Sequence, residues 1–469
     1  MKFFLISFIF AFLFFSIYSQ VIHVTQTAKN TDDRLTPKPD IYFQDKKINE
    51  NEIIIDQNQI YQTIYGFGGA FTEACAVNWI KLNSTLRHQI LYEYFHNLHY
   101  RVGRVHINSC DFCESSYSFD NIPNDYELKN FSLRNGHDLY TVIPLIKQAL
   151  EIVDDEFRLF GSPWSPPFWM KQNQNMNTST TPGLINSPQI HQSWALYFSK
   201  WISAYEEQGI PIWGITIQNE PANDALWESC CYTVDEEADF LANYLGPQLK
   251  KDHPDVKIMM YDYNKDHVYD WAQGILGNRP DASKYVDGVA FHWYSGSEFG
   301  NVEKIHDEFP GYFLLATEAC VCPYTFAYDW ATGESYAFDI LGDLNSWAVG
   351  WVDWNLCLDT HGGPNHLNNF CGSPIMIDPD THQIIYQPAF YYMGQISKFV
   401  LPGSRRIYSY VLNQNIDIVS SAFISPTGDI VLVVLNQSYE EQSFDIVFNQ
   451  RYANVTLPEN SIATFVFEN

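Results

Sequence analysis

Short apolar runs alternate with longer stretches of helical spacing from about residue 64 to residue 355. The short runs are rich in β-branched and aromatic residues, which favours strands, whereas the longer stretches place apolar residues on one helical face. Strands that alternate with helices eight times predict a closed parallel (β/α)8 barrel, the TIM-barrel architecture. The expected strands are Ile64–Phe71, Val102–Ile107, Phe157–Ser162, Ile212–Ile217, Ile258–Tyr261, Gly288–Trp293, Tyr312–Thr317 and Gly350–Trp354.

Two of the intervening helices carry clear boundary signals. In Trp194–Tyr205 the large side chains fall on one face, and Gly209 and Pro211 then end the helix. In Thr233–Leu245 the opening threonine and Glu236 have the spacing of a capping box. The apolar faces of both helices predict packing against the barrel, not function.

A different pattern begins after Phe399, where short strand-like segments follow one another without helical spacing. The mature amino end, with Val21–Thr27 and Ile53–Ile55, has the same character. We therefore expect residues 20–62 and 399–469 to form one small all-β sandwich, with the barrel of residues 63–398 inserted between them. The expected strands at the carboxyl end are Arg406–Leu412, Ile416–Ile424, Ile430–Leu435, Phe444–Phe448 and Ile462–Phe467.

Residues 1–19 have the pattern of a secretory signal peptide: Lys2, an apolar run from Phe3, and a small residue, Ser19, before the polar Gln20. An uncleaved anchor is the alternative, but the run falls just short of the roughly 18 apolar residues of a membrane span. Entry into the secretory pathway leaves a lysosome-like acidic compartment and secretion both open. It also suits a glycoprotein with sequons at Asn83, Asn130, Asn177, Asn436 and Asn454.

The nine cysteines are an odd number, so at least one is free or pairs with another chain. Cys110 and Cys113 have the C-x-x-C spacing of a redox or metal site. Because no second C-x-x-C and no histidine pair at zinc spacing accompanies them, we expect a structural role.

Charge and composition narrow the possible partners. The 27 basic and 55 acidic residues give a formal charge of −28, which excludes nucleic acid as a partner because the phosphates would repel the chain. The same surplus gives no general attraction to anionic membranes. A hydrophobic content of 46% excludes a disordered chain, and the 16% of aromatic residues suits a sugar-binding enzyme as well as an ordinary aromatic core.

Two glutamates stand at the carboxyl ends of predicted barrel strands, where barrel enzymes place their chemistry. Glu220 follows the fourth strand and Glu318 the seventh. A buried carboxylate costs several kcal/mol unless it is paired or functional. A glutamate that directly follows an apolar run is therefore expected to have a partner or a function. Either glutamate alone is better read as a solvated loop residue. Together they match the acid and nucleophile of a glycosidase.

The other strand ends are polar and aromatic, as a sugar site requires. Aromatic faces pack on the C–H faces of a sugar, and acidic, amide and guanidinium groups bind its hydroxyls. His106 and His292 lie on different strands without a metal-binding motif, so we expect hydrogen bonding, no metal and no cofactor. The glycines that follow Gly66 lack the spacing of a nucleotide loop.

These residues resemble glycoside hydrolase family 30, and specifically its glucosylceramidases (acid β-glucosidases, glucocerebrosidase-like). The resemblance extends from about Tyr65 through Lys398 and more loosely into the β module. The motifs that carry it, in the family's order, are Gly66–Ala74, Ser109–Phe112, Ser162–Lys171, Asn219–Pro221, His292–Tyr294, Glu318–Cys320, Gly350–Asn355 and Gly362–Asn365.

The resemblance implies a retaining mechanism with Glu220 as general acid/base and Glu318 as nucleophile. Asn219 would hold the 2-hydroxyl of the sugar. The implied substrate-binding residues are Glu73, Trp164, Asn219, Tyr294, Trp354 and Asn365, and the implied supporting residues are Arg104 and His292. The segment Trp227–Tyr232 is similar to bacterial more than to animal members and is expected beside the entrance.

The expected reaction is hydrolysis of glucosylceramide, or another β-glucoside, to glucose and ceramide through a covalent glucosyl-enzyme intermediate. A lipid-presenting activator protein or a membrane surface is the partner that such a substrate implies. The alternatives are a family 30 β-xylosidase, an endo-β-1,6-glucanase, and, from another class, a non-catalytic carbohydrate- or lipid-binding protein.

Overall fold

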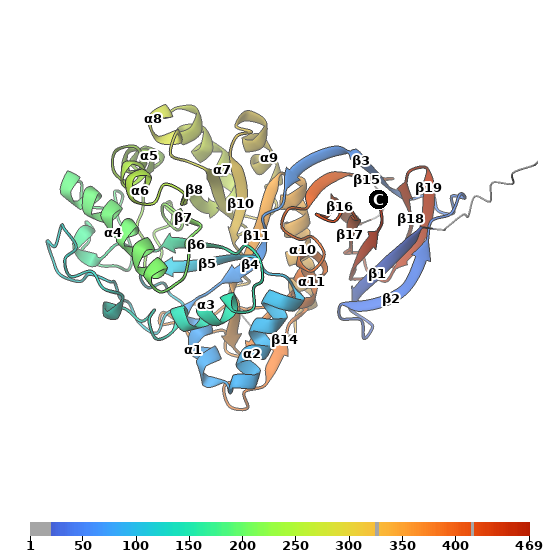
Figure 1. Ribbon diagram of the computed structural model, residues 1–469, viewed down its shortest axis with the longest axis horizontal. Helices are drawn as coiled ribbons and strands as arrows, with labels where there is room; N and C mark the ends of the chain where they lie inside the picture. The colour runs from blue at the N-terminus through green and yellow to red at the C-terminus, as the bar shows by residue number, and fades with distance from the viewer. Residues whose placement is uncertain (1–19, 324–327, 414–416) are drawn as a thin grey trace, which may run out of the picture.

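The computed structural model describes residues 20–323, 328–413 and 417–469. Within them, eight parallel strands close into a barrel in the order β10-β11-β4-β5-β6-β7-β8-β9 (Figure 1). All eight predicted strands are confirmed, with ends shifted by three residues at most. They are β4 Gly66–Ala70, β5 Val102–Ile107, β6 Arg158–Pro163, β7 Gly214–Thr216, β8 Lys257–Asn264, β9 Gly288–His292, β10 Phe313–Glu318 and β11 Ala348–Asn355.

The inside of the barrel is filled with apolar side chains, including Val102, Phe160, Met259 and Leu315. Gly68 permits the close pairing of β4 with β5, because a Cβ at this position would lie 1.6 Å from the carbonyl oxygen of Val102. A packed interior of this kind leaves the rim at the carboxyl ends of the strands as the place for a site.

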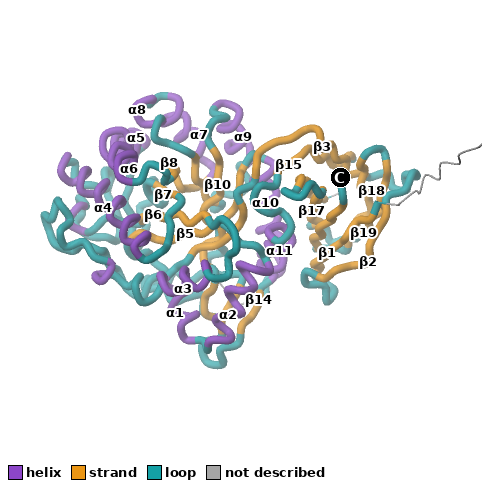
Figure 2. Tube along the Cα trace, in the orientation of Figure 1, coloured by secondary structure: helices purple, strands orange, loops and turns teal. Residues whose placement is uncertain are grey.

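Helices surround the barrel on its outer side (Figure 2). The capping box of Thr233 and Glu236 and the helix over Trp194–Tyr205 are confirmed. None of the helices in the described ranges combines the length and apolar content needed to cross a membrane. The α-helices are α1 Glu73–Lys81, α2 Ser84–Tyr92, α3 Val142–Leu150, α4 Pro188–Glu207, α5 Val234–Phe240, α6 Gly246–Asp252, α7 Lys265–Ala272, α8 Pro280–Ser283, α9 Phe299–Glu308, α10 Trp330–Asn345 and α11 Pro388–Ser397.

Both ends of the chain share one β-sheet, with strand order β19-β18-β3-β15-β16-β17-β20-β1-β2. The blue amino-terminal strands lie among the red carboxyl-terminal ones in Figure 1. The strands are β1 Val21–Ala28, β2 Thr36–Tyr42, β3 Glu52–Thr63, β15 Arg405–Leu412, β16 Ile418–Ile424, β17 Ile430–Asn436, β18 Gln442–Phe448, β19 Arg451–Leu457 and β20 Ser461–Phe467.

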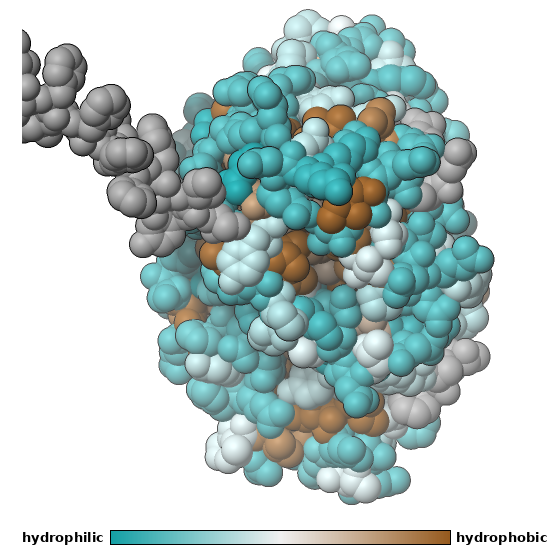
Figure 3. Space-filling view, turned by 90° about the vertical axis from the view of Figure 1, so that its right-hand side faces the viewer, coloured by the Kyte–Doolittle hydropathy of each residue, from teal (hydrophilic) through white to brown (hydrophobic). Residues whose placement is uncertain are grey.

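The sheet folds over on itself into a sandwich. A bridge between Gln44 and Tyr452 joins its two ends, and one apolar core collects side chains from both halves. The outward side chains at this end of the molecule are largely polar, with small separate apolar patches (Figure 3). The predicted interleaving of residues 20–62 with residues after 399 therefore agrees with the pairing of β3 between β15 and β18.

The sequence pattern missed two strands of this sheet and one small sheet. β2 carries Pro37 and Pro39 and is mostly exposed, as is usual for an edge strand. In β19, buried and exposed side chains alternate only from Ala453 onward. The small sheet consists of β12 Cys357–Asp359, β13 Ile375–Ile377 and β14 Ile384–Tyr386. The predicted signal peptide, residues 1–19, and Ile416 at the start of a predicted strand lie outside the described residues.

All nine cysteines are described. Cys322 and Cys371 form a disulfide, and the other seven are buried thiols. The sulfur atoms of Cys110 and Cys113 lie 3.9 Å apart. The odd number of cysteines is thus accounted for within one chain by free thiols.

One of the five sequons is buried. In a host that glycosylates secreted proteins, we expect no glycan on Asn436, because its side-chain nitrogen is enclosed and donates to the carbonyl oxygens of Glu440 (3.1 Å) and Pro458 (2.7 Å). Asn83, Asn130 and Asn454 are exposed and open to modification. Glycopeptide mass spectrometry of the folded protein checks this, and a glycan on Asn436 would contradict the fold at β17.

Candidate active site

A cavity of about 270 Å³ opens at the carboxyl ends of the barrel strands. Its lining includes six of the ten residues singled out from the sequence: Trp164, Asn219, Glu220, Tyr294, Glu318 and Trp354. Arg104 and His292 are fully buried directly behind this wall, hydrogen-bonded to the two glutamates. The structure therefore brings eight of the ten residues to one place.

The two glutamates face each other across the cavity. One carboxylate oxygen of Glu220 and one of Glu318 lie within 4.8 Å. Glu318 ends β10, and Glu220 follows β7 with a left-handed backbone (φ +48°). A non-glycine residue in this region is strained, and such strain persists only where the surroundings hold it. Here the backbone N–H of Glu220 donates to the carbonyl oxygen of Asp262 at 2.9 Å.

Arg104, on β5, is a buried cation that holds several site residues at once. Its guanidinium donates to Glu318 and, at 2.8 Å each, to Asn219 and Asp262. The same group packs over the ring of Trp164 at 4.8 Å. The nucleophile candidate and the 2-hydroxyl ligand candidate are therefore fixed by one side chain.

Asp262 is a buried residue of the site that sequence reasoning missed. Its carboxylate accepts hydrogen bonds from Arg104, from Thr216 (2.7 Å) and from Thr317 (2.6 Å), and it lies 2.9 Å from a ring nitrogen of His292. Burial raises the pKa of Asp262, but attraction by Arg104 and His292 outweighs this and holds the pKa well below its usual range. The signal was present, since Asp262 directly follows the predicted strand that ends at Tyr261.

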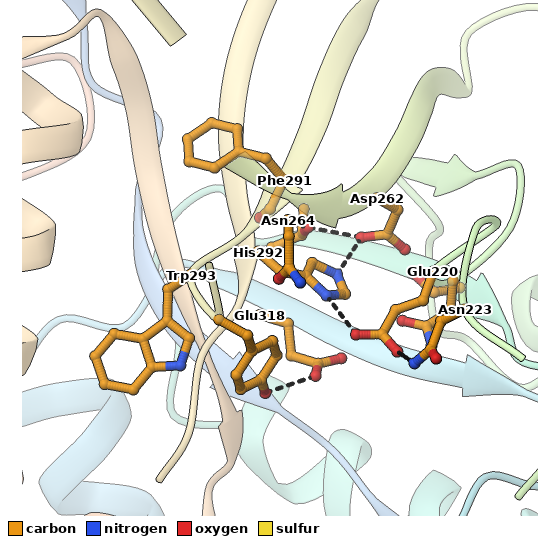
Figure 4. A network of polar contacts seen from close by, with 12 residues as sticks. Glu220, Asn223, Asp262, Asn264, Phe291, His292, Trp293 and Glu318 are labelled. Carbon is orange, nitrogen blue, oxygen red and sulfur yellow. Dashed lines mark hydrogen bonds and ion pairs between the residues drawn. The ribbon is translucent and has the colours of Figure 1, made fainter. Parts of the chain in front are cut away.

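His292 lies between two carboxylates (Figure 4). Its Nδ1 is 3.3 Å from Glu220 and its Nε2 is 2.9 Å from Asp262. Burial lowers the pKa of His292, but the charges of Glu318 and Asp262 and the two hydrogen bonds raise it to about 9. The ring is therefore an imidazolium at neutral pH, and both of its nitrogens donate.

Glu318 has opposing influences on its ionisation. Burial raises its pKa, and the charge of Glu220 adds to this. His292, Arg104 and a hydrogen bond from Tyr294 (2.8 Å) oppose the rise. Burial outweighs them, so the pKa of Glu318 stays above its usual range, while three groups that stabilise its ionised form surround the carboxylate.

Glu73, one of the implied substrate-binding residues, lies outside the cavity lining. This residue opens α1, is fully buried, and pairs with Nδ1 of His137 at 2.8 Å. Asp111 is an acidic residue that lines the wall. The resemblance implies Glu73 as a substrate-binding residue, whereas Asp111 lies in the loop after β5 and reaches the cavity only through loop folding.

Asn365 also lies behind the wall, where it supports Asp111. The side-chain nitrogens of Asn365 and Asn369 donate to the same oxygen of Asp111 at 3.0 and 2.9 Å. Burial raises the pKa of Asp111 to about 7, although these two hydrogen bonds oppose the rise. Beside it, the rings of Trp164 and Trp354 stack at 4.9 Å. An acid, an amide and two aromatic rings therefore gather in this part of the cavity wall.

Another part of the cavity wall combines aromatic and amide groups. Trp227, Tyr263 and Asn264 line it, and Asn223 donates to Glu220 at 2.6 Å. The Cys322–Cys371 disulfide also lines the wall. A leaving group beyond Glu220 would meet this surface.

Three clusters in the described residues have metal-ligand atoms within 4.8 Å of one another, and each is otherwise engaged. In His106–Cys110–Cys113, one ring nitrogen faces the carbonyl of Asn108 and the other accepts from the backbone of Glu73. In Glu220–His292–Glu318, both ring nitrogens face carboxylates. The third contains the disulfide.

Comparisons with known proteins find matches over most of the chain. Residues 64–400 match the glycosyl hydrolase family 30 TIM-barrel domain, and residues 403–465 match the glycosyl hydrolase family 30 beta sandwich domain. The "Putative glucosylceramidase 3" of Caenorhabditis elegans is 37% identical over 90% of this chain and 84% of its own. The "Lysosomal acid glucosylceramidase" of Mus musculus is 36% identical over 81% of this chain and 76% of its own.

Two solved structures are also similar. SrfJ from Salmonella typhimurium superposes with a TM-score of 0.90 at 29% identity, covering 96% of this chain and 100% of its own. The endo-β1,6-glucanase BT3312 superposes with a TM-score of 0.84 at 27% identity, covering 96% of this chain and 99% of its own.

We expect the folded protein to be more stable at pH 5 than at pH 8. The pKa of Asp111 is raised to about 7 and that of His292 to about 9, from roughly 3.9 and 6.5 in an unfolded chain. A raised pKa means that the folded state binds the proton more tightly, so stability is full below the unfolded pKa and is lost as pH rises through the folded pKa. Thermal unfolding from pH 4 to 9 measures this. The Asp111→Asn variant should lose less stability between pH 4 and 7, and a wild-type melting temperature that rises from pH 5 to 8 would contradict the assignment.

Proposed function

The chain belongs to glycoside hydrolase family 30 and is a glycoside hydrolase. On this basis we propose that it is a retaining β-glucosidase, which hydrolyses glucosylceramide to glucose and ceramide. The observation that carries the proposal is the approach of the Glu220 and Glu318 carboxylate oxygens to within 4.8 Å. Retaining glycosidases hold the two carboxyl groups about 5–5.5 Å apart, whereas inverting enzymes need about 6.5–9.5 Å for a water molecule.

In the first step, ionised Glu318 attacks the anomeric carbon and forms a glucosyl ester. Glu220 delivers its proton to the departing oxygen, so the bond to the aglycone breaks without a free alkoxide. Arg104 and Tyr294 hold the attacking carboxylate by hydrogen bonds. Asn219, fixed by Arg104, faces the cavity where a 2-hydroxyl would bind.

In the second step, Glu220 takes a proton from water, which attacks the anomeric carbon and releases glucose with the β configuration. Glu318 carries no charge while it is esterified. The pKa of His292 therefore falls, because the charge of Glu318 contributes to raising it. The ionisation of Glu318 and His292 therefore differs between the two steps of the reaction.

Different observations support the two parts of the proposed substrate, the glucose and the ceramide. Trp164, Trp354 and Asp111 form the sugar end, and the glucosylceramidase names of the relatives from worm and mouse support glucosylceramide. A secretory route, either to an acidic lysosome-like compartment or to secretion, is consistent with the greater stability expected at acidic pH. An activator protein or a membrane surface would present the lipid, since the charge of −28 attracts no anionic bilayer by itself.

Replacement of the two glutamates separates their roles. Glu318→Gln should reduce turnover of an aryl β-glucoside to the assay limit and abolish labelling by a 2-deoxy-2-fluoroglucoside, which in the wild type adds one glucosyl mass at Glu318. Glu220→Gln should lose about 10²–10⁴-fold on substrates with poor leaving groups and less on activated ones. NMR should show β-glucose as the first product. Full activity of Glu318→Gln, or initial release of α-glucose, would refute the retaining assignment.

A β-1,6-glucanase is the second candidate, favoured by the 27% identity and TM-score of 0.84 to the endo-β1,6-glucanase BT3312. A substrate panel decides between the two. We expect turnover of glucosylceramide with detergent at pH 5, with kcat/KM at least about tenfold above that for β-1,6-glucan, a difference of about 1.4 kcal/mol in transition-state binding. An aryl β-xyloside serves as the control for sugar specificity. Faster hydrolysis of the glucan would overturn the lipid assignment and leave the glycosidase assignment intact.

A further inference from the structure

Glu228 is a buried carboxylate that neither step of the proposed reaction uses. It lies in the segment Trp227–Tyr232, and only 1% of its surface is exposed. Its Oε1 accepts from the hydroxyl of Ser109 at 2.7 Å and lies 3.5 Å from Nε2 of His366. Its Oε2 has no hydrogen-bond partner among the described residues. A carboxylate in such surroundings is costly to bury, so its place calls for a role.

Glu228, Ser109 and His366 belong to three different loops, and each of these loops contributes to the cavity wall. The loop of Glu228 carries Trp227. The loop of Ser109 carries Asp111, and the loop of His366 carries Asn369, which holds Asp111. One carboxylate oxygen therefore joins three loops of the cavity wall.

The direction of each hydrogen bond is set by its neighbours. The hydroxyl oxygen of Ser109 accepts from the backbone of Tyr117 at 2.9 Å, which leaves its proton to donate to Glu228. Nδ1 of His366 faces the carbonyl oxygens of Asp111 and Cys113 at 3.1 and 3.2 Å, so this nitrogen carries a proton. His366 thus holds the backbone of Asp111 with one nitrogen and faces Glu228 with the other.

The segment that carries Glu228 is itself fixed from the other side. The buried ammonium of Lys171 donates to the carbonyl oxygens of Met176 (3.0 Å), Thr178 and Ser229. The backbone N–H of Thr178 donates to the carbonyl oxygen of Trp227 at 2.9 Å. Glu228 therefore projects from a rigid base, and its contacts transmit that rigidity to the loop of Asp111.

We propose that Glu228 is a positioning residue that holds Asp111 in the sugar pocket and fixes its distance from Trp227. The inference rests on the proposed function, because it assigns Asp111 to sugar binding. Glu228 touches no substrate; it acts through Ser109 and His366. The property it controls is the affinity for the sugar ring, and the chemistry at Glu220 and Glu318 is left in place.

Three variants test this: Glu228→Ala, Glu228→Gln and, as a matched control, Glu207→Gln at the exposed end of α4. The assays use an aryl β-glucoside as substrate and 1-deoxynojirimycin as a glucose-shaped inhibitor. Glu228→Ala should raise KM and Ki about tenfold, because one buried hydrogen-bond partner is lost. The decrease in kcat should be smaller. Glu228→Gln should raise both KM and Ki about threefold, since its amide oxygen still accepts from Ser109 but the carboxylate charge that strengthens this hydrogen bond is gone. The control should match the wild type.

Hydrogen exchange measured by mass spectrometry gives a readout that does not depend on sugar. In Glu228→Ala, amides of residues 109–113 and 365–369 should exchange faster than in the wild type and the control. Unchanged KM, Ki and exchange in Glu228→Ala would overturn the inference; if this variant does not fold, unchanged values in Glu228→Gln would do so. If the wild type neither turns over the glucoside nor binds the inhibitor while exchange responds as expected, the proposed function fails and the connection between the loops stands.

Discussion

The burial of Arg104 is the constraint on which the catalytic end of the molecule depends. Its guanidinium is fully enclosed and is balanced by Asp262 and Glu318. Removal of one partner from a buried ion pair typically costs about 3–5 kcal/mol, so the strands that carry these three residues must keep their register. The carboxylates of this cluster also raise the pKa of His292, whose protonated ring lies close to both glutamates. Stability of the barrel and ionisation of the site are therefore set by the same contacts.

Backbone geometry at the strand ends turns this charge cluster into a site. Tyr261 and Asp262 both have positive φ where the pairing of β8 with β9 shifts register, and this bulge directs the carboxylate of Asp262 toward Arg104. Glu220 has positive φ as well, and its backbone is held by the carbonyl of Asp262. Strained residues thus support each other around the cavity, in keeping with the tendency of strain to gather at functional sites.

The sandwich is joined to the barrel through the helices that flank the strands of the site. α10, which connects β10 to β11, presents the indole N–H of Trp330 to Tyr392 of α11 and to the carbonyl of Asn460 in the sandwich. α11 is further held by Thr464 of β20, which donates to Gln395. The sandwich therefore contacts two helices, of which α10 connects the strands that carry Glu318 and Trp354.

The sequence by itself determined the eight barrel strands and the positions of the two central carboxylates along the chain. Strand runs, helix caps and the places of Glu220 and Glu318 are local properties of the chain, and local patterns predict which residues stand at the ends of strands. Only the tertiary structure decided which of those side chains enter the cavity. Glu73 stands at a strand end and turns away to His137, whereas Asp111 and Glu228 reach the site from loops that the pattern leaves undefined. The physical reason is that the direction of a side chain depends on bulges, positive φ angles and packing between distant loops, and these are settled only when the barrel closes.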